Sequence, residues 1–541
     1  MTTITANDAQ TGGQAGRPEL DRGLGRAGWI GFGAAILAAL IYVMSSVYGD
    51  ASAAGVDTTV ILPFILLFLA LVIALGFEFV NGFHDTANAV ATVIYTNSMP
   101  AHVAVVWSGF FNFLGVLLST GAVAFGIISL LPVELILQVG SGAGFAMVFA
   151  LLIAAILWNL ATWALAIPAS SSHTLIGSII GVGVANAMMH GRSGTAGVDW
   201  SKATEIGQSL LISPLVGFFL AALLLIVMKV VIRNKALYEA PKDGLPPPWW
   251  IRLLLISTCT GVSFAHGSND GQKGMGLIML ILIGVVPTAY ALNRAVPAQY
   301  VAEFHVNAMA AEGALKSPAS TTPAIDAAAA RAAVTRYIAE KRYLPETKPA
   351  LAALITDIDA QVQGYGSLAK VPSAAVNNMR NDMYLASEAI KRLGKDHSAA
   401  AVGEPQAKAL DTFKKDLDEA TRFIPLWVKI AVAFALGLGT MVGWKRIVVT
   451  VGEKIGKTHL TYAQGGAAEL VAMGTIFAAD TMGLPVSTTH VLSSGVAGTM
   501  AANNSGLQMS TIRNLLMAWV LTLPISILLS GTLYVLFTLV M

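Results

Sequence analysis

The sequence predicts an all-α, polytopic membrane protein built from two repeats of inverted topology, whose broken helices and helical hairpins meet at the midplane of the bilayer. The first observation is composition: of 541 residues, 55% are hydrophobic and only 12% are charged, whereas soluble domains are about a quarter charged. The second observation is that two motifs recur in both halves of the chain. The third is one hydrophilic stretch, residues 296–424, which predicts a small extramembrane helical insert.

Long windows with almost no charge mark the spans, because a helix needs about 20 apolar residues to cross a bilayer. Such windows occur at Ile30–Val47, Val60–Leu75, Phe145–Ile167 and Pro214–Met228. Together with the more polar segments that carry the motifs, they predict about eleven passes, some broken or paired as hairpins. The single Cys259 excludes an intrachain disulfide and a cysteine-rich metal site.

Lysine and arginine near the ends of spans set the orientation, because they gather on the cytoplasmic side. Clusters at 17–26, 229–252 and 445–457 therefore predict a cytoplasmic N-terminus and an extracytoplasmic C-terminus. The expected segments are a disordered cytoplasmic N-terminus (1–27), an extra transmembrane helix (28–48), transmembrane repeat 1 (58–233), a cytoplasmic linker (234–250), the two parts of repeat 2 (251–295 and 425–541) and an extracytoplasmic helical insert (296–424).

The repeat is visible in two pairs of matching motifs. Gly76–Val93 reads GFEFVNGFHDTANAVATV and Gly261–Ile278 reads GVSFAHGSNDGQKGMGLI, so that Asp85 and Asp270 coincide. In the same way AIPASSSHTLIGSIIGVGVAN, from residue 166, matches GLPVSTTHVLSSGVAGTMAAN, from residue 483. Both motifs are expected to interrupt helices. Two similar halves of opposite topology are typical of secondary transporters, in which the substrate site lies where interrupted helices meet.

The paired acids predict a site for a cation or for protons. A carboxylate at bilayer depth is costly and faces a polar cavity or a partner. A lone acid could simply cap a half-helix, but Asp85 and Asp270 occupy the same place in both halves. Asn81, Asn88 and Asn269 add carbonyl oxygens, which suit a hard cation.

The second motif predicts an anion site. In each half, hydroxyl residues follow a proline and open a glycine-rich helix, and a helix N-terminus with hydroxyl donors binds anions. An ordinary serine or threonine N-cap is the alternative. The candidate anion ligands are Ser170, Ser171, Ser172, Thr174, Ser487, Thr488 and Thr489, together with Gln272 and Lys273.

Histidines beside both motifs are candidates for a proton relay, because histidine changes charge near neutral pH. They are His84, His173, His266 and His490, and Glu78 is added as an acid present in one half only. Each histidine could equally orient a hydroxyl group or satisfy a buried carbonyl. Asn112, Asn159, Glu469 and Asp480 are further polar positions in or beside apolar spans, and helix–helix hydrogen bonding is the expected role of the two asparagines.

Four segments closely resemble the PiT family of inorganic phosphate transporters, above all its bacterial low-affinity Pit-type carriers. They are NGFHDTANAVATVIYT (Asn81–Thr96), PASSSHTLIG (Pro168–Gly177), AHGSNDGQKGMGLIMLILIGV (Ala265–Val285) and PVSTTHVLSS (Pro485–Ser494). The resemblance carries the family's site onto the acidic motifs and onto the two hydroxyl trios. It runs from about Val60 onward, so the N-terminal extension Met1–Val56 departs from the usual core.

The resemblance implies a transporter, not an enzyme, that imports phosphate across the bacterial inner membrane by cation symport. Proton coupling is expected, with phosphate carried as a neutral complex with a divalent metal such as magnesium. A sodium-coupled symporter, or a carrier of another tetrahedral oxyanion, is the alternative. No permanently bound cofactor and no nucleic-acid partner are expected. The expected partners are inorganic phosphate, arsenate as its analogue, and the lipid bilayer, and the resemblance is compatible with a homodimer.

Two rival classes remain distinguishable. An intramembrane hydrolase built on Ser172 and His173 is disfavoured, because nucleophile and base normally come from different elements and these two residues are adjacent. A passive anion channel would conduct without regard to pH, sodium or membrane potential.

Overall fold

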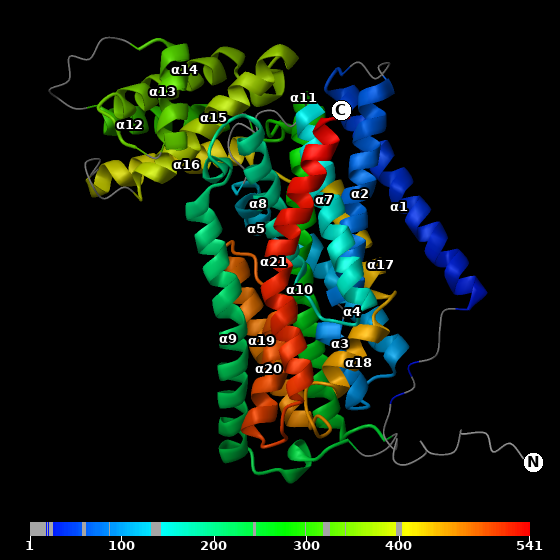
Figure 1. The fold of residues 1–541 in the computed structure, drawn as a ribbon. Coiled ribbons are helices and arrows are strands. Elements are labelled where there is room, and N and C mark those ends of the chain that lie inside the picture. Colours follow the sequence, from blue (N-terminus) through cyan, green and yellow to red (C-terminus); the bar gives the residue numbers. More distant parts are fainter. Residues whose placement is uncertain are drawn as a thin grey trace, which may run out of the picture.

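The protein is a bundle of long helices with a smaller group of helices at one end (Figure 1). The computed structural model describes residues 18, 20, 25–56, 61–85, 87–130, 142–241, 245–297, 299–316, 325–340, 342–395 and 403–540. Within these ranges the regular structure is helical, apart from one isolated bridge between Gly456 and Leu507. The all-α prediction is therefore confirmed.

Seven of the described helical segments are long and apolar enough to cross a membrane. They are α1 (Arg26–Ala53), α2 (Ile61–Asp85) continued by α3 (Ala87–Tyr95), α4 (Ala101–Leu118), α7 (Gly142–Ala164), α8 (Ser171–Met189), α9 (Trp200–Val231) and α21 (Met509–Thr538). An eighth span results if α16 (Glu404–Thr421) and α17 (Leu426–Thr440), bent by 72°, count as one.

The expected eleven passes are not reached on length and hydropathy alone. Three more bundle helices are α10 (Trp249–Val285), α19 (Tyr462–Thr481) and α20 (Thr488–Ala502). Helices α10 and α20 carry polar residues of the motifs, α19 carries Glu469 and Asp480, and α20 is also short. Shorter elements complete the bundle: α5 (Ala122–Ile128), η1 (Gly194–Gly197), η2 (Lys235–Tyr238), α11 (Pro287–Tyr290) and α18 (Lys445–Glu453).

The outer faces of the bundle are apolar. On α9, Leu215 and Phe219 are 57% and 63% exposed, and on α21, Val520 and Leu528 are 72% and 70% exposed. Large apolar side chains on such a surface would be unfavourable in water, whereas lipid accommodates them. This pattern supports a bundle that is surrounded by hydrocarbon.

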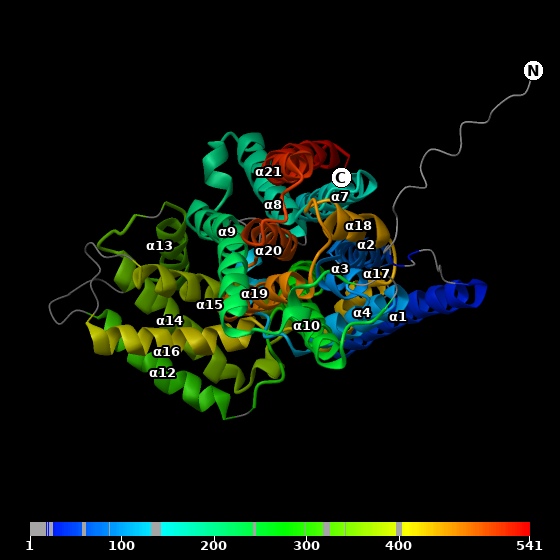
Figure 2. The same cartoon turned by 90° about the horizontal axis from the view of Figure 1, so that it is seen from below.

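The helices of the two halves exchange partners. Helix α8 packs on α21 while α20 packs on α9, and α4 packs on α10 while α17 packs on α2 (Figures 1 and 2). Glycine permits this approach: a Cβ atom on Gly82 would collide with the Leu436 carbonyl of α17, and one on Gly267 with the Asn112 carbonyl of α4. These matched pairs are what a two-fold repeat requires. The inverted topology itself stays a prediction.

The first acidic motif lies where α2 ends at Asp85 and α3 begins at Ala87, and the one residue between them is outside the described part of the chain. The prediction that the second acidic motif interrupts a helix was wrong, since α10 continues through this motif from Trp249 to Val285. Its glycines serve packing instead: a Cβ on Gly271 would meet Val116, and one on Gly274 would meet Glu78. Sequence glycines alone do not distinguish a helix break from a close helix contact.

The hydroxyl motifs lie in two hairpins, α7–α8 and α19–α20. Each hairpin reverses through a residue in the left-handed region, Ala166 (φ 55°) in the first and Gly483 (φ 65°) in the second. The backbone is then non-helical until Ser171 and Thr488, where the following helices begin. The two matched hairpins point the N-termini of α8 and α20 into the bundle, where they meet α2 and α10.

Five helices follow α11 and form the insert. They are α12 (Tyr300–Leu315), α13 (Ala327–Glu340), α14 (Thr347–Tyr365), α15 (Ser373–Leu393) and α16, with the short η3 (Leu368–Lys370) between α14 and α15. Their apolar faces bury residues such as Phe304, Ile355, Met383 and Phe413. Figures 1 and 2 show these helices at one end of the bundle, projecting to the side away from α1.

Candidate functional site

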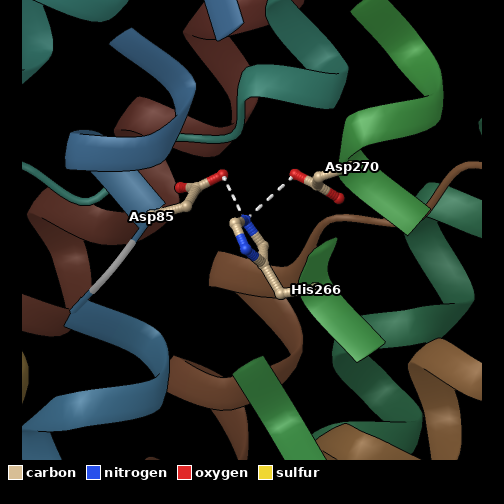
Figure 3. Close-up of side chains that lie close together, drawn as sticks. All are labelled: Asp85, His266 and Asp270. Atoms are coloured by element: carbon tan, nitrogen blue, oxygen red, sulfur yellow. Dashed lines mark ion pairs between the residues drawn. The ribbon is translucent and has the colours of Figure 1, made fainter. Parts of the chain in front are cut away.

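The paired acids meet at one histidine. Asp85 lies at the end of α2, and His266 and Asp270 lie one turn apart on α10. Figure 3 shows the imidazole between the two carboxylates, with His266 Nε2 3.8 Å from Asp85 Oδ2 and 3.5 Å from Asp270 Oδ2. All three side chains are buried, and their ligand atoms lie close enough together to hold a metal ion.

Both hydroxyl motifs reach Asp85. Ser171 Oγ donates to Asp85 Oδ2 at 2.9 Å, and Thr489 Oγ1 donates to Asp85 Oδ1 at 2.5 Å. Ser171 Oγ also lies 3.5 Å from Asp270 Oδ2. Residues from three other helices, α8, α10 and α20, therefore approach the Asp85 carboxylate of α2.

Lys273 is buried and forms an ion pair within the same site. Its Nζ lies 2.7 Å from Asp270 Oδ1 and donates to Ser172 Oγ at 2.5 Å. Ser172 Oγ in turn donates to the Val486 carbonyl at 2.6 Å. Lys273, which the sequence predicts as an anion ligand, therefore neutralises Asp270 in this structure.

Glu78 adds a further carboxylate close by. It is fully buried, and Asn81 Nδ2 lies 3.4 Å from its Oε2. Glu78 Oε1 and Asn81 Oδ1 have no hydrogen-bond partner within the described part of the chain. A buried charge without partners is strongly disfavoured. These two oxygens therefore suit a proton or a cation.

The four histidines fall into two pairs. His84 contacts Asp85: its Nδ1 lies 3.3 Å from Asp85 Oδ1, and its Nε2 lies 3.2 Å from Thr162 Oγ1. His266 is oriented by Asn112, whose Oδ1 lies 2.8 Å from His266 Nδ1. These contacts make His84 and His266 the histidines that can exchange protons with Asp85.

His173 and His490 instead contact each other, with ring centroids 4.7 Å apart, and His490 stacks on Trp519 at 4.1 Å. Their backbone N–H groups donate to Ser170 Oγ at 3.2 Å and to Ser487 Oγ at 3.1 Å. Ser170 and Ser487 therefore act as N-caps of α8 and α20, which is the ordinary alternative to an anion ligand.

Of the remaining predicted ligands, Thr174 and Asn269 hold neighbouring elements. Thr174 Oγ1 donates to Asn159 Oδ1 at 3.1 Å, whereas Thr488 Oγ1 is buried without a partner among the described residues. Asn269 Nδ2 donates to the Leu484 carbonyl at 3.2 Å and so holds the segment that precedes α20.

Gln272 connects three elements of the bundle. Its Nε2 donates to Asp480 Oδ1 of α19 at 2.7 Å, and its Oε1 accepts from Val123 N of α5 at 2.9 Å. In this structure it therefore holds α5 and α19 against α10, and both its polar groups are already used. The side chain of Asn88, another predicted cation ligand, lies outside the described part of the chain.

Some residues of the site carried only a weak sequence signal. Asn112 and Asp480 stood out merely as polar residues beside apolar segments, yet they fix His266 and Gln272. Thr162 and Trp519, which contact His84 and His490, gave no signal at all. Their roles depend on which helices are neighbours, and the local sequence does not contain that information.

The chain matches known proteins over most of its length. Residues 81–530 match the family model described as the phosphate transporter family. One solved structure, of a protein described as the sodium-dependent phosphate transporter, aligns with a TM-score of 0.48 and 19% identity, covering 88% of this chain and 100% of that one.

Two curated relatives come from Escherichia coli strain K12. The chain is 43% identical over 485 residues to the low-affinity inorganic phosphate transporter PitA, covering 87% of this chain and 96% of that protein. It is 41% identical over 488 residues to the low-affinity inorganic phosphate transporter PitB, with the same coverage of each. This chain therefore belongs to the phosphate transporter family, and it is a transporter rather than an enzyme.

Proposed function

We propose that this protein imports inorganic phosphate across the bacterial cytoplasmic membrane by cation symport, with protons as the coupling ion and phosphate carried as a neutral complex with a divalent metal such as magnesium. The relatives named as inorganic phosphate transporters support the substrate. The observation that carries the coupling is the convergence of both hydroxyl motifs on Asp85, beside Asp270 and His266.

The charge of the site makes a cation necessary. Two aspartates and one lysine leave one negative charge when the histidines are neutral, and Glu78 can add another. A second unit charge at about 4 Å contributes about 4 kcal/mol of repulsion at an effective dielectric constant of about 20. A phosphate dianion therefore cannot enter beside these acids unless a proton or a metal ion accompanies it.

Asp85 offers a direct link between cation and anion. Its oxygens now accept from Ser171 and Thr489, the hydroxyl groups best placed to bind phosphate. A proton or metal ion on Asp85 weakens these hydrogen bonds, because a neutralised carboxylate is a poorer acceptor. Both hydroxyl groups can then turn to a phosphate oxygen. Loading of the cation thus prepares the anion site.

The closed state of the site implies alternating access. The residues at the centre of the site are almost fully buried, and none of them is more than 2% exposed. They are Asp85, Ser171, His266, Asp270 and Thr489. Substrate can reach them only if helices move, and the exchanged pairs α8–α21 and α20–α9 are suitable rigid units. In the proposed orientation the N-terminus is cytoplasmic, and the insert and the C-terminus are extracytoplasmic. In Figure 1 the C-terminal end of α21 lies at the same end of the bundle as the insert, which supports placing both on one side of the membrane.

The test is phosphate uptake into proteoliposomes in which sodium and pH gradients are imposed separately, each with and without magnesium. Proton–metal coupling predicts uptake that follows the pH gradient, requires magnesium and ignores sodium. Uptake driven by sodium without pH dependence would replace the proposed coupling with sodium symport. Arsenate should compete with phosphate, since it has the same shape and charge, whereas equal competition by sulfate would indicate a general oxyanion carrier.

A further inference from the structure

A buried arginine that pairs with no acidic residue among those described lies where the insert meets the bundle. Arg380, on α15, is only 6% exposed. Its Nη1 donates to Asn381 Oδ1 at 3.3 Å, its guanidinium lies over the Tyr384 ring at 5.2 Å, and its Nε has no hydrogen-bond partner within the described residues. Burial lowers the pKa of Arg380, and no described carboxylate offsets that effect. Buried charges are normally paired, so this guanidinium is missing an anion.

A small cavity adjoins Arg380. It has a volume of about 30 Å³ and lies between the end of α5, the last turns of α10, and helices α15 and α16. A single water needs about 10–15 Å³. The polar residues that line the cavity are Ser129, Arg380, Tyr384, Glu388, Thr421 and Arg422.

The one carboxylate in this cavity is already used. Glu388 Oε1 accepts from Arg422 Nη2 at 3.0 Å, and Glu388 Oε2 lies 3.0 Å from Lys391 Nζ. Arg422 also pairs with Asp418, at 3.1 Å. Arg380, Arg422 and Glu388 therefore leave a net positive charge in the cavity lining. This charge favours an anionic ligand.

A larger cavity, of about 330 Å³, opens on the other side of Glu388, between the first turn of α9 and helices α13 and α15. Its basic residues are Lys202, Lys391, Arg392 and Lys395, and its acidic ones are Asp199, Glu205 and Glu388. Glu388 lines both cavities, so the larger one lies beside the small cavity that adjoins Arg380.

We propose that Arg380 is the centre of a second anion site, formed jointly by the insert and the bundle, for a phosphate group. A guanidinium presents two parallel donors that match two oxygens of a phosphate. Ser129 and Thr421, which now donate to backbone carbonyls, add hydroxyl groups that can rotate toward it. A phosphate group needs more room than the present cavity offers, so the long Arg422 side chain must shift when it binds.

This proposal rests on the proposed function only for the choice of ligand, and the two can fail separately. The experiment is equilibrium binding of radiolabelled inorganic phosphate to the full-length protein in nanodiscs of zwitterionic lipid. Wild type should bind at two saturable sites. Arg380→Gln should weaken one of them by about 10-fold or more, because it removes a charge-assisted bidentate pair.

Two further variants separate the sites. Arg336→Gln is the matched control, since Arg336 lies on the insert, is 53% exposed and pairs only loosely with Glu346 at 3.8 Å; it should keep both sites. Lys273→Met disables the central site and should keep the Arg380 site. A single site in wild type that Lys273→Met abolishes would overturn the second site and leave the proposed function standing. The second site would also be refuted if the Arg380→Gln variant bound phosphate as the wild type does.

The phosphate group could also belong to a lipid, and a second arm distinguishes that source. The same titration is repeated in nanodiscs that contain an anionic phospholipid. Competition at the Arg380 site identifies a lipid headgroup as the occupant, and undiminished binding identifies free phosphate. Failure of both to bind refutes the proposal. If Arg380→Gln does not fold, Arg380→Lys and Thr421→Val serve instead; each should weaken the second site while leaving the central one unchanged.

Discussion

Replacing Asp85 by asparagine should abolish coupled uptake while leaving the protein folded. The amide has nearly the shape of the carboxylate, so the packing at the end of α2 is retained. It lacks the negative charge that would hold the coupling cation, and it is a weaker acceptor for Ser171 Oγ and Thr489 Oγ1.

The geometry sets the size of this effect. His266 Nε2 lies 3.8 Å from Asp85 Oδ2 and marks where a cation could sit between the acids. At about that distance a unit charge pair contributes about 4 kcal/mol when the effective dielectric constant is about 20. Such a loss corresponds to about 1,000-fold weaker cation binding. Because the amide oxygen can still coordinate, we expect a reduction in uptake of about 100- to 1,000-fold at limiting cation.

Uptake of radiolabelled phosphate into proteoliposomes under an imposed pH gradient is the assay, with protein incorporation measured in parallel. The matched control is Asp411→Asn, because Asp411 lies on α16 and its side chain is 62% exposed; it should transport as wild type does. If Asp85→Asn retains uptake within about twofold of wild type, and that uptake still follows the pH gradient, Asp85 does not hold the coupling cation.

Three further changes test the fold. Ala166→Gly should stabilise the protein by about 1 kcal/mol in thermal unfolding, because alanine is strained at φ 55°; an unchanged midpoint would contradict strain at this turn. Gly267→Val should destabilise it by about 1–3 kcal/mol, since its Cβ would collide with the Asn112 carbonyl, whereas Gly207→Val, which faces open space, should not. Half-burial raises the pKa of Asp416, so its charge costs stability above that pKa. Asp416→Asn should therefore stabilise the protein at neutral pH, with the gain disappearing toward about pH 4; a gain that grows as pH falls would refute this sign.

The sequence was sufficient for the fold class, and it singled out two acids that the structure brings close together. Hydropathy identified seven of the described spans, because lipid-facing helices must be apolar along their length, but it did not identify α10, α19 and α20. The two matched motifs predicted that Asp85 and Asp270 would lie together, and both acids approach His266 in the structure. The same reasoning predicted that the two hydroxyl motifs lie near the acids. It did not predict that Ser171 and Thr489 both donate to Asp85, rather than one to each aspartate.

What remained hidden depends on contacts between distant segments. The continuous course of α10 through Gly267 and Gly271 could not be read from glycines, which serve both breaks and close packing. Likewise, the use of Gln272 to hold α5 and α19 follows from the position of Asp480 in space. Asn112 fixes His266 only because α4 lies against α10.

The exchange of partners between the two halves has a consequence for how the protein is made. A ribosome delivers α2 and α8 long before α17 and α21, the helices against which they pack. Until then, Asp85 and the hydroxyl groups of α8 lack part of their contacts, and the whole insert is translated in between. Neither half can mature first. A chain stopped before α21 should therefore be a substrate for membrane proteases, whereas two fragments divided within the insert and produced together could still assemble.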